Sequence, residues 1–401
     1  MTNLPIRHAE GAHRYTGPMI DDAHFTHGLA GDQQVPDWPP LAADEVSSVL
    51  VGYPALCATG PILWHSPRPL SAAARVATAG GEVFVKRHHR RVRDVLTLRE
   101  EHRFAGHVRA RGIPVPAVLA DAAGHSAVAQ GDWVYEVHRC ATGTDVYRDA
   151  FSWSPIGGIA HARVAGAMLA RLHLAAEGFD APQRGTQLLV ARADILGARD
   201  ALGTLAAQLP MRPALAAYLH ERDWRSEIAA ALQPWQVRSA AGIARQPPLW
   251  THGDWHVSNL CWSDAGDEAR ITDVLDFGLC ARTFALFDLA TAIERNAIAW
   301  LDLGQEAIAR TDLALALVEG YRSVRPLGAD DLAVLADVLP VVHVDFALSE
   351  VEYFEGVTRR RDHADVAYYT FLLGHARWFA GDEGQALLKA LHHADRAFVV
   401  Q

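Results

Sequence analysis

The sequence predicts an α+β protein with two lobes, a smaller lobe built on an antiparallel sheet and a larger, mainly helical lobe. The chain has 401 residues, which exceeds a typical domain of roughly 150 residues and favours more than one lobe. Short apolar runs typical of strands gather between residues 61 and 138. A helical period dominates after about residue 150, with one interruption between residues 247 and 277.

Composition restricts the partners that the protein can have. Half of the residues are apolar and 21% are charged, as in an ordinary soluble globular protein. Because 47 Asp and Glu oppose 37 Lys and Arg, we expect no general attraction to nucleic acid or to an anionic membrane. The N-terminus lacks a signal-type apolar segment, and the 4 cysteines show no metal-ligand spacing. We therefore expect a cytoplasmic protein.

The first part of the chain contains the elements of the smaller lobe. Residues 1–38 are rich in Gly, Pro, Asp and His without a period, which predicts an irregular extension. A helix signature follows and stops at Gly52. The remaining patterns of this part predict strands at 61–64, 74–77 and 82–86, a helix from 93 to 111, and two more strands at 115–119 and 132–138. We take residues 39–138 as the smaller lobe.

The second part, residues 139–401, is predicted to be the helical lobe. The first helix spans 160–176, and alanine-rich helices continue to about residue 240. The interruption contains two strand-like runs, 259–262 and 270–275, on either side of a turn-forming segment at 263–268. This pattern predicts a β-hairpin, after which helices resume to the C-terminus.

The predicted hairpin carries polar residues at one edge. A turn near residues 265–266 places Asn259, at the start of one strand, close to Asp276, at the end of the other, while Asp254 lies in the preceding loop. Two hard oxygen ligands for Mg²⁺ and a separate carboxylate are the minimum for phosphoryl transfer. Taken alone, each residue is better explained as a turn or strand-end residue, since Asp and Asn are common there.

The segment HGDWHVSN, followed by a hairpin and DFG, resembles the signature of the aminoglycoside phosphotransferase and choline kinase-like superfamily. The resemblance extends from about residue 40 to the C-terminus. It implies the bilobal fold of protein kinases, with an N-lobe sheet plus one helix and a helical C-lobe carrying the catalytic hairpin. It also implies ATP and Mg²⁺ as cofactors.

Carried onto this chain, the resemblance makes Asp254 the catalytic carboxylate and Asn259 and Asp276 the magnesium ligands. Lys86, at the end of the run EVFVK, matches the lysine that contacts the α- and β-phosphates. Its expected partner is a glutamate on the following helix. Glu100 and Glu101 both qualify, and we choose Glu101 because it shares a helix face with the apolar residues that should point inward.

The loop expected to cover the phosphates, residues 65–71, contains no glycine and departs from the glycine-rich loop of protein kinases. Ser71 or Arg68 is expected to contribute contacts there. Two further family marks, His173 in a segment LARLH and Asp288 in DLA, are expected to be structural, with Asp288 bracing the catalytic loop.

Only 11 residues, 277–287, separate Asp276 from Asp288, too few for a long activation segment that binds a peptide. A small hydroxylated substrate is therefore favoured. Polar and aromatic residues after Asp288 could contact it: Glu294, Arg295, Trp300, Asp345, Glu352 and Glu355. The last three recur at helical spacing, so they form either an acidic wall for an amine or a solvated helix face.

The predicted function is ATP- and Mg²⁺-dependent phosphorylation of a small-molecule hydroxyl, in an amino sugar of the aminoglycoside type, homoserine, methylthioribose or choline. The alternative is a nucleotide-binding pseudokinase that serves as a scaffold or sensor. The histidine pairs 88–89 and 392–393 lack carboxylates at helical spacing, so we expect surface histidines rather than metal ligands there.

Overall fold

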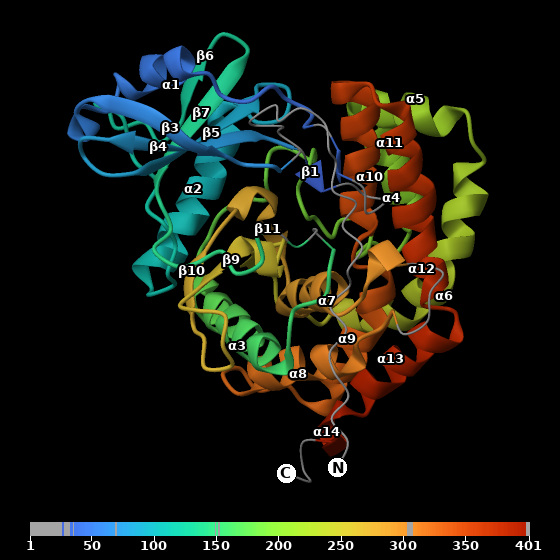
Figure 1. Ribbon diagram of the computed structural model, residues 1–401. Helices are drawn as coiled ribbons and strands as arrows, with labels where there is room; N and C mark the ends of the chain where they lie inside the picture. The colour runs from blue at the N-terminus through green and yellow to red at the C-terminus, as the bar shows by residue number, and fades with distance from the viewer. Residues whose placement is uncertain are drawn as a thin grey trace, which may run out of the picture.

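The computed structural model describes residues 26–27, 33–34, 36–68, 70–148, 150, 153–302 and 308–397. Most of the predicted N-terminal extension therefore lies outside the described residues; inside it, β1 (Thr26–His27) pairs with β2 (Gln33–Gln34). Figure 1 shows a smaller lobe around one twisted sheet and a larger lobe made of helices.

The smaller lobe is built on a five-stranded antiparallel sheet in the order β3-β4-β5-β7-β6. The strands are β3 (Thr59–His65), β4 (Ala72–Thr78), β5 (Val83–His89), β6 (Val128–Gln130) and β7 (Trp133–Arg139). The predicted meander is confirmed. The predicted strand at 115–119 is wrong, since only Val118 bridges His138 there. Pro114 and Pro116 explain the difference, because proline has no amide hydrogen for a strand ladder.

Two helices flank this sheet. The helix α1 (Ala43–Leu50) buries three apolar side chains against it. The helix α2 (Val95–Ala110) starts at Asp94, whose carboxylate accepts the Thr97 amide at 2.8 Å while the Thr97 hydroxyl accepts the Asp94 amide at 2.9 Å. It ends before Gly112, which has a positive φ of 91° that favours glycine.

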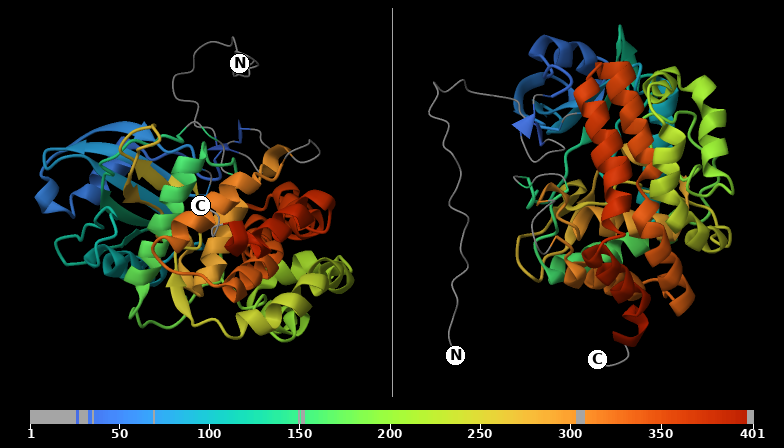
Figure 2. Two further views of the ribbon diagram at one scale, coloured as in Figure 1. Left: turned by 90° about the horizontal axis from the view of Figure 1, so that it is seen from below. Right: turned by 90° about the vertical axis from the view of Figure 1, so that its right-hand side faces the viewer.

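The larger lobe packs helices around one extended core. Its helices are α3 (Ile159–Ala176), α4 (Ala201–Gln208), α5 (Pro213–His220), α6 (Trp224–Ile243), α7 (Ala285–Asn296), α8 (Thr311–Arg322), α9 (Ala329–Val338), α10 (Val344–Tyr353), α11 (Arg361–Asp365), α12 (His375–Trp378), α13 (Asp382–His392) and α14 (Ala394–Ala397). Two π-helical segments, η7 (Phe354–Thr358) and η8 (Val366–Gly374), continue α10 and α11. Figure 2 shows these last helices as a column beside α4–α6.

Short helical turns link the longer elements: η1 (Pro54–Leu56), η2 (Leu209–Met211), η3 (Val257–Asn259), η4 (Phe277–Leu279), η5 (Trp300–Asp302) and η6 (Leu339–Val341). The centre of the lobe is the contact between α3 and α8. A Cβ on Gly166 would lie 2.0 Å from the Leu317 carbonyl oxygen, and one on Gly320 would lie 1.9 Å from that of Arg163. The two helix backbones therefore touch directly.

The predicted hairpin is present as β9 (Leu260–Trp262) and β10 (Ile271–Val274), an antiparallel pair. A second pair, β8 (Leu249–Thr251) with β11 (Ala281–Thr283), was not predicted. Strands of three residues carry too little alternation to be recognised in a sequence. Together the two pairs fix both ends of the loops that carry Asp254 and Asp276.

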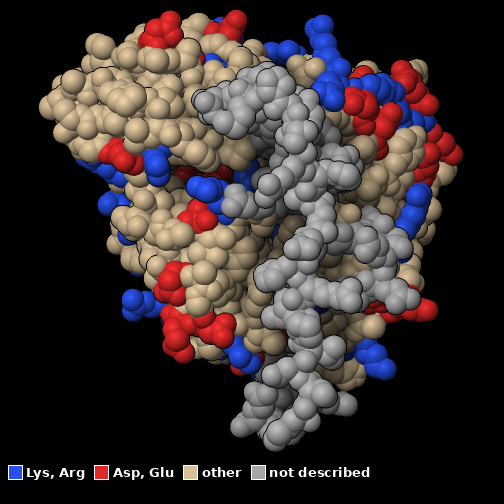
Figure 3. All heavy atoms as spheres, in the orientation of Figure 1, with Lys and Arg blue, Asp and Glu red and all other residues tan. Residues whose placement is uncertain are grey.

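One helical run, 329–358, is long and apolar enough to cross a membrane by length and composition. Its most apolar window is 89% buried within the protein, so packing in the core accounts for its composition. On the face drawn in Figure 3, acidic and basic side chains alternate over the described surface, densest above α5 and α11 at the upper right. There Arg361 pairs with Glu221 and Glu355.

Candidate active site

The loop that carries Asp254 is held in place by a buried carboxylate. Asp288, on α7, accepts the amides of His252 and Gly253, each at 2.8 Å, and lies 3.1 Å from His173 Nε2. Gly253 has a φ of 77°, and a Cβ there would lie 2.7 Å from the Leu279 carbonyl oxygen. Only glycine fits this turn. The bracing expected of Asp288 agrees with this geometry.

Asp254 is buried among polar groups. Its Oδ1 lies 2.7 Å from Arg295 Nη1, and its Oδ2 accepts the amide nitrogen of Asn259 at 3.0 Å and lies 3.6 Å from His256 Nε2. Burial raises the pKa of Asp254, but Arg295 and His256 outweigh it and hold the pKa below its usual range. Asp254 is therefore ionised at neutral pH.

Lys86, from the smaller lobe, meets Asp276, from the larger lobe. Lys86 extends from β5, and its Nζ lies 3.1 Å from Asp276 Oδ1, which also accepts the Gly278 amide at 3.2 Å. Burial raises the pKa of Asp276, and the neighbouring ammonium group lowers it by more. The Asp276 side chain keeps 41% of its surface exposed, so its carboxylate is accessible to a ligand.

Asn259 lies beside Asp276 through the hairpin, because the Leu275 amide donates to the Asn259 carbonyl oxygen at 2.8 Å. The side-chain nitrogen of Asn259 binds Asp254, which leaves its amide oxygen for a metal ion. Asp276 likewise uses Oδ1 for its protein contacts. One amide oxygen and one carboxylate are hard donors of the kind that Mg²⁺ prefers, so this donor set fits that ion.

Glu101 has other partners than the expected Lys86. Its Oε1 lies 2.7 Å from Arg93 Nε and 2.6 Å from Arg184 Nη2, and across the described residues no hydrogen bond or ion pair joins it to Lys86. Both arginines also donate to the carbonyl oxygen of Gly278. Glu101 thus connects α2 to the loop that follows Asp276. Glu100, the other candidate, pairs with Arg184 at 3.0 Å.

The loop between β3 and β4 contains Ser71 and Arg68. Ser71 is half-buried and directly precedes β4, where Ala73 lies opposite Lys86. Burial lowers the pKa of Arg68, and Asp254 and Asp276 act in the opposite direction, so its guanidinium lies within electrostatic reach of both carboxylates. This loop therefore brings a positive charge to the same site despite lacking glycine.

On the other side of Asp254 lies a group of buried charged and aromatic residues. The Arg295 guanidinium lies 4.4 Å from the Trp153 ring centre and 5.2 Å from that of Phe346. Burial raises the pKa of Glu294 to about 7 and that of Glu350 to about 8, against the opposing effect of Arg295. Glu350 Oε2 is buried without a hydrogen-bond partner in the part of the chain that the structure describes.

Of the substrate contacts predicted from the sequence, Glu294, Arg295 and Trp300 lie in this group. Trp300 donates to the Glu294 carbonyl oxygen at 2.8 Å. The sequence analysis missed Glu350, which belongs to the same helix as Asp345. Polar and apolar residues of α10 are buried alike, so no pattern in its sequence marks Glu350.

The acidic wall suggested by Asp345, Glu352 and Glu355 is not formed. Asp345 accepts the amides of Ile195 and Leu196. Glu352 and Glu355 each pair with an arginine, Arg212 and Arg361 respectively. The alternative prediction, a solvated helix face, is also wrong for Asp345, because that side chain is buried. All three carboxylates serve contacts within the protein.

The segment that contains these residues matches a known protein family. A model of the phosphotransferase enzyme family, named APH, matches residues 70–327, a span that includes Lys86, both strand pairs and Asp288. The chain belongs to this phosphotransferase family. The predicted family and the predicted enzyme class, a phosphotransferase, are thereby confirmed.

One curated relative is a homoserine kinase of Gluconobacter oxydans (strain 621H), 28% identical over 186 residues. The match covers 46% of this chain and 51% of the relative, so the chain spans about half the length of the curated relative it matches.

Solved structures of low sequence identity show the fold of this phosphotransferase. A microcompartment-associated aminopropanol kinase is 16% identical, with a TM-score of 0.54 over 86% of this chain and 100% of that one. An amicoumacin kinase, solved with AMP-PNP and Ca²⁺, is 15% identical, with a TM-score of 0.53 over 82% and 97%. An aminoglycoside phosphotransferase from Alicyclobacillus acidocaldarius is 14% identical, with a TM-score of 0.50 over 90% and 98%. The predicted protein-kinase-like bilobal fold is confirmed.

Proposed function

We propose that this phosphotransferase transfers the γ-phosphoryl group of ATP, bound with Mg²⁺, to a hydroxyl group of a small molecule. The observation that carries the proposal is the contact of Lys86 Nζ with Asp276 Oδ1 at 3.1 Å, between residues 190 positions apart in the chain. The fold alone does not require a lysine from the sheet to meet a carboxylate that follows the hairpin. Binding of one nucleotide by both residues would require it.

Each residue near this contact has a proposed role. Lys86 binds the α- and β-phosphates, and Ser71 and Arg68 contribute further phosphate contacts. Asn259 and Asp276 hold Mg²⁺, which neutralises the phosphate charge when bound. Asp254 accepts or orients the proton of the substrate hydroxyl; its lowered pKa keeps the carboxylate ionised, so it can accept a hydrogen bond from that hydroxyl. Glu101, through Arg93 and Arg184, holds α2 against the loop that follows Asp276.

For the substrate, we infer a hydroxylated compound that carries both an ammonium and a carboxylate group. The buried carboxyl groups of Glu294 and Glu350 suit an ammonium group, and the Arg295 guanidinium beside Asp254 suits a carboxylate. Homoserine carries both groups and the names of two similar proteins, a homoserine kinase and an aminopropanol kinase, support an amino alcohol. Choline has only the cationic group and methylthioribose has neither.

The test is ADP formation from ATP with homoserine, 1-amino-2-propanol, choline, methylthioribose and an aminoglycoside as acceptors. We expect turnover with homoserine, its loss in Asp254→Ala, and its retention in the control Asp264→Ala, which changes an exposed aspartate in the hairpin turn. Nucleotide binding without turnover for any acceptor would instead support the scaffold or sensor.

A cytoplasmic location is part of the same proposal. The 4 cysteines, Cys57, Cys140, Cys261 and Cys280, are all free thiols, which suits a reducing compartment. ATP and Mg²⁺ are abundant cytoplasmic solutes, which suits the proposed reaction.

A further inference from the structure

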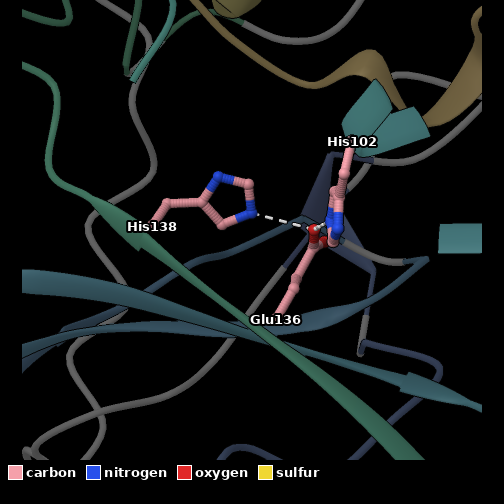
Figure 4. A group of neighbouring side chains, drawn as sticks. All are labelled: His102, Glu136 and His138. Atoms are coloured by element: carbon pink, nitrogen blue, oxygen red, sulfur yellow. Dashed lines mark hydrogen bonds and ion pairs between the residues drawn. The ribbon is translucent and has the colours of Figure 1, made fainter. Parts of the chain in front are cut away.

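A cluster of imidazoles and one carboxylate lies between α2 and the sheet, apart from the proposed substrate site. Glu136 and His138 extend from the same face of β7, because they are two residues apart, and His102 extends from α2. Glu136 Oε2 lies 2.7 Å from His102 Nε2 and 2.8 Å from His138 Nε2. Figure 4 shows the three side chains converging on one point.

The candidate ligand atoms lie close enough together for small side-chain movements to form a metal site. One atom from each of His102, Glu136 and His138 lies within 4.8 Å of the others. Bonds of about 2.0–2.1 Å from zinc to nitrogen or oxygen put neighbouring ligand atoms roughly 3.3 Å apart. The two nitrogen atoms therefore need to retreat from the carboxylate oxygen by only about half an ångström, which side-chain torsions can supply.

The surroundings of the cluster hold its members in place. His102 Nδ1 lies 2.9 Å from Ser126 Oγ, so its other ring nitrogen faces Glu136. The second carboxylate oxygen, Glu136 Oε1, lies 2.9 Å from His88 Nε2. Such outer contacts to metal-binding histidines and carboxylates are the usual way to fix their orientation. His88, expected on the surface, is instead buried here, which corrects that prediction.

We propose that His102, Glu136 and His138 bind a divalent transition-metal ion of the zinc class. Two imidazoles and a carboxylate suit Zn²⁺, Co²⁺ or Ni²⁺ and disfavour Mg²⁺, which prefers oxygen ligands, so this site is chemically distinct from the proposed nucleotide site. The His138 side chain is 24% exposed while those of the other two are below 10%, which gives the ion one route of entry. Three protein ligands leave a fourth position for water.

Binding requires no redox partner and no net loss of protons from neutral imidazoles. Each histidine moves its ring proton from Nε2 to Nδ1 and offers the Nε2 lone pair to the ion. For His102 the relocated proton is donated to Ser126 Oγ. Because the ion joins α2 to the strand next to Lys86, it stabilises the folded protein in proportion to its concentration.

The experiment titrates metal-free protein, without nucleotide, with Co²⁺ and follows the visible absorption of the ion, and measures Zn²⁺ by equilibrium dialysis. We compare the wild type with His138→Gln, which is partly exposed and tolerant of change, and with His102→Gln. The control is His393→Gln, a histidine exposed on the opposite lobe. Circular dichroism checks that each variant is folded.

We expect about one equivalent of Zn²⁺ in the wild type and in His393→Gln, a Co²⁺ spectrum of tetrahedral type, and at least tenfold weaker binding in His138→Gln. The melting temperature should rise with Zn²⁺ in the wild type and not in His138→Gln. Absence of stoichiometric Zn²⁺, or equal binding by His138→Gln, would overturn the site and leave a carboxylate held by three imidazole N–H groups. Neither result bears on phosphoryl transfer.

Discussion

Replacing Asp288 by alanine removes the carboxylate that fixes the catalytic loop. Asp288 is fully buried, and its two oxygens accept the amides of His252 and Gly253 at 2.8 Å. In the variant these two buried amides lose their acceptors, and His173 loses its contact at 3.1 Å. The loop that carries Asp254 then keeps its contacts with Arg295 and Asn296 but loses the carboxylate that accepts two of its amides.

The magnitude follows from the count of orphaned groups. A buried polar group left without a partner costs about 1–3 kcal/mol, so the two amides and His173 together give about 3–9 kcal/mol. We expect the free energy of unfolding, measured in urea, to fall by that amount, a large share of the roughly 5–15 kcal/mol of a typical domain. The variant should also lose phosphoryl transfer, and this loss should be present at urea concentrations at which the variant is still folded.

The matched control is Tyr321→Phe, which removes only the hydroxyl that lies 2.7 Å from His173 Nδ1, at the far end of the same chain of contacts. It should cost about 1–3 kcal/mol, because one buried ring nitrogen loses its partner, and leave turnover almost unchanged. If Asp288→Ala loses less than about 1 kcal/mol, or loses no more than the control, the carboxylate does not hold the loop and the reasoning is refuted.

Three further predictions concern other parts of the chain. Burial raises the pKa of Glu350 to about 8, so its carboxyl group is protonated at pH 6 and ionised at pH 9. The KM for an ammonium-bearing substrate should therefore fall as the pH rises through 8. The same pH dependence of KM in Glu350→Gln would contradict this. Gly320→Ala should lower the free energy of unfolding by at least about 1–3 kcal/mol, because its new Cβ meets the Arg163 carbonyl group. The control Gly106→Ala, with open space around the new Cβ, should raise the free energy of unfolding by about 0.5–1 kcal/mol. Thermal melting separates the two variants, and a stabilised Gly320→Ala would show that α3 and α8 are not in contact. Lys86→Met should weaken binding of a fluorescent ATP analogue at least tenfold, by loss of a charge-assisted contact with phosphate, and unchanged affinity would exclude Lys86 from the nucleotide site.

The parts of the site that follow from local sequence were predictable. Asn259 and Asp276 flank one hairpin and Asp254 lies in the loop before it, and the turn residues at 263–268 determine which strand ends face each other. Lys86 ends an apolar run that could only be a strand. In each of these cases the spacing along the chain and the geometry of a strand pair carry the information.

The parts that depend on distant segments were not predictable. Glu101 was placed on the inner face of α2, which is correct, but Arg184 lies 83 positions further along and nothing local indicates that it captures this carboxylate. Glu350, on α10, lies within electrostatic range of Arg295, on α7, and its burial depends on the whole lobe. Side-chain partners over such separations are decided by tertiary packing, which a helical period does not encode.

The central claim is that Lys86 and the hairpin residues surround one magnesium-bound nucleotide. Its most direct test is calorimetric titration with a non-hydrolysable ATP analogue, with and without Mg²⁺, in the wild type and in Asp276→Ala. We predict that Mg²⁺ strengthens binding at least tenfold in the wild type and has almost no effect in the variant. An equal effect of Mg²⁺ on both proteins would contradict the claim.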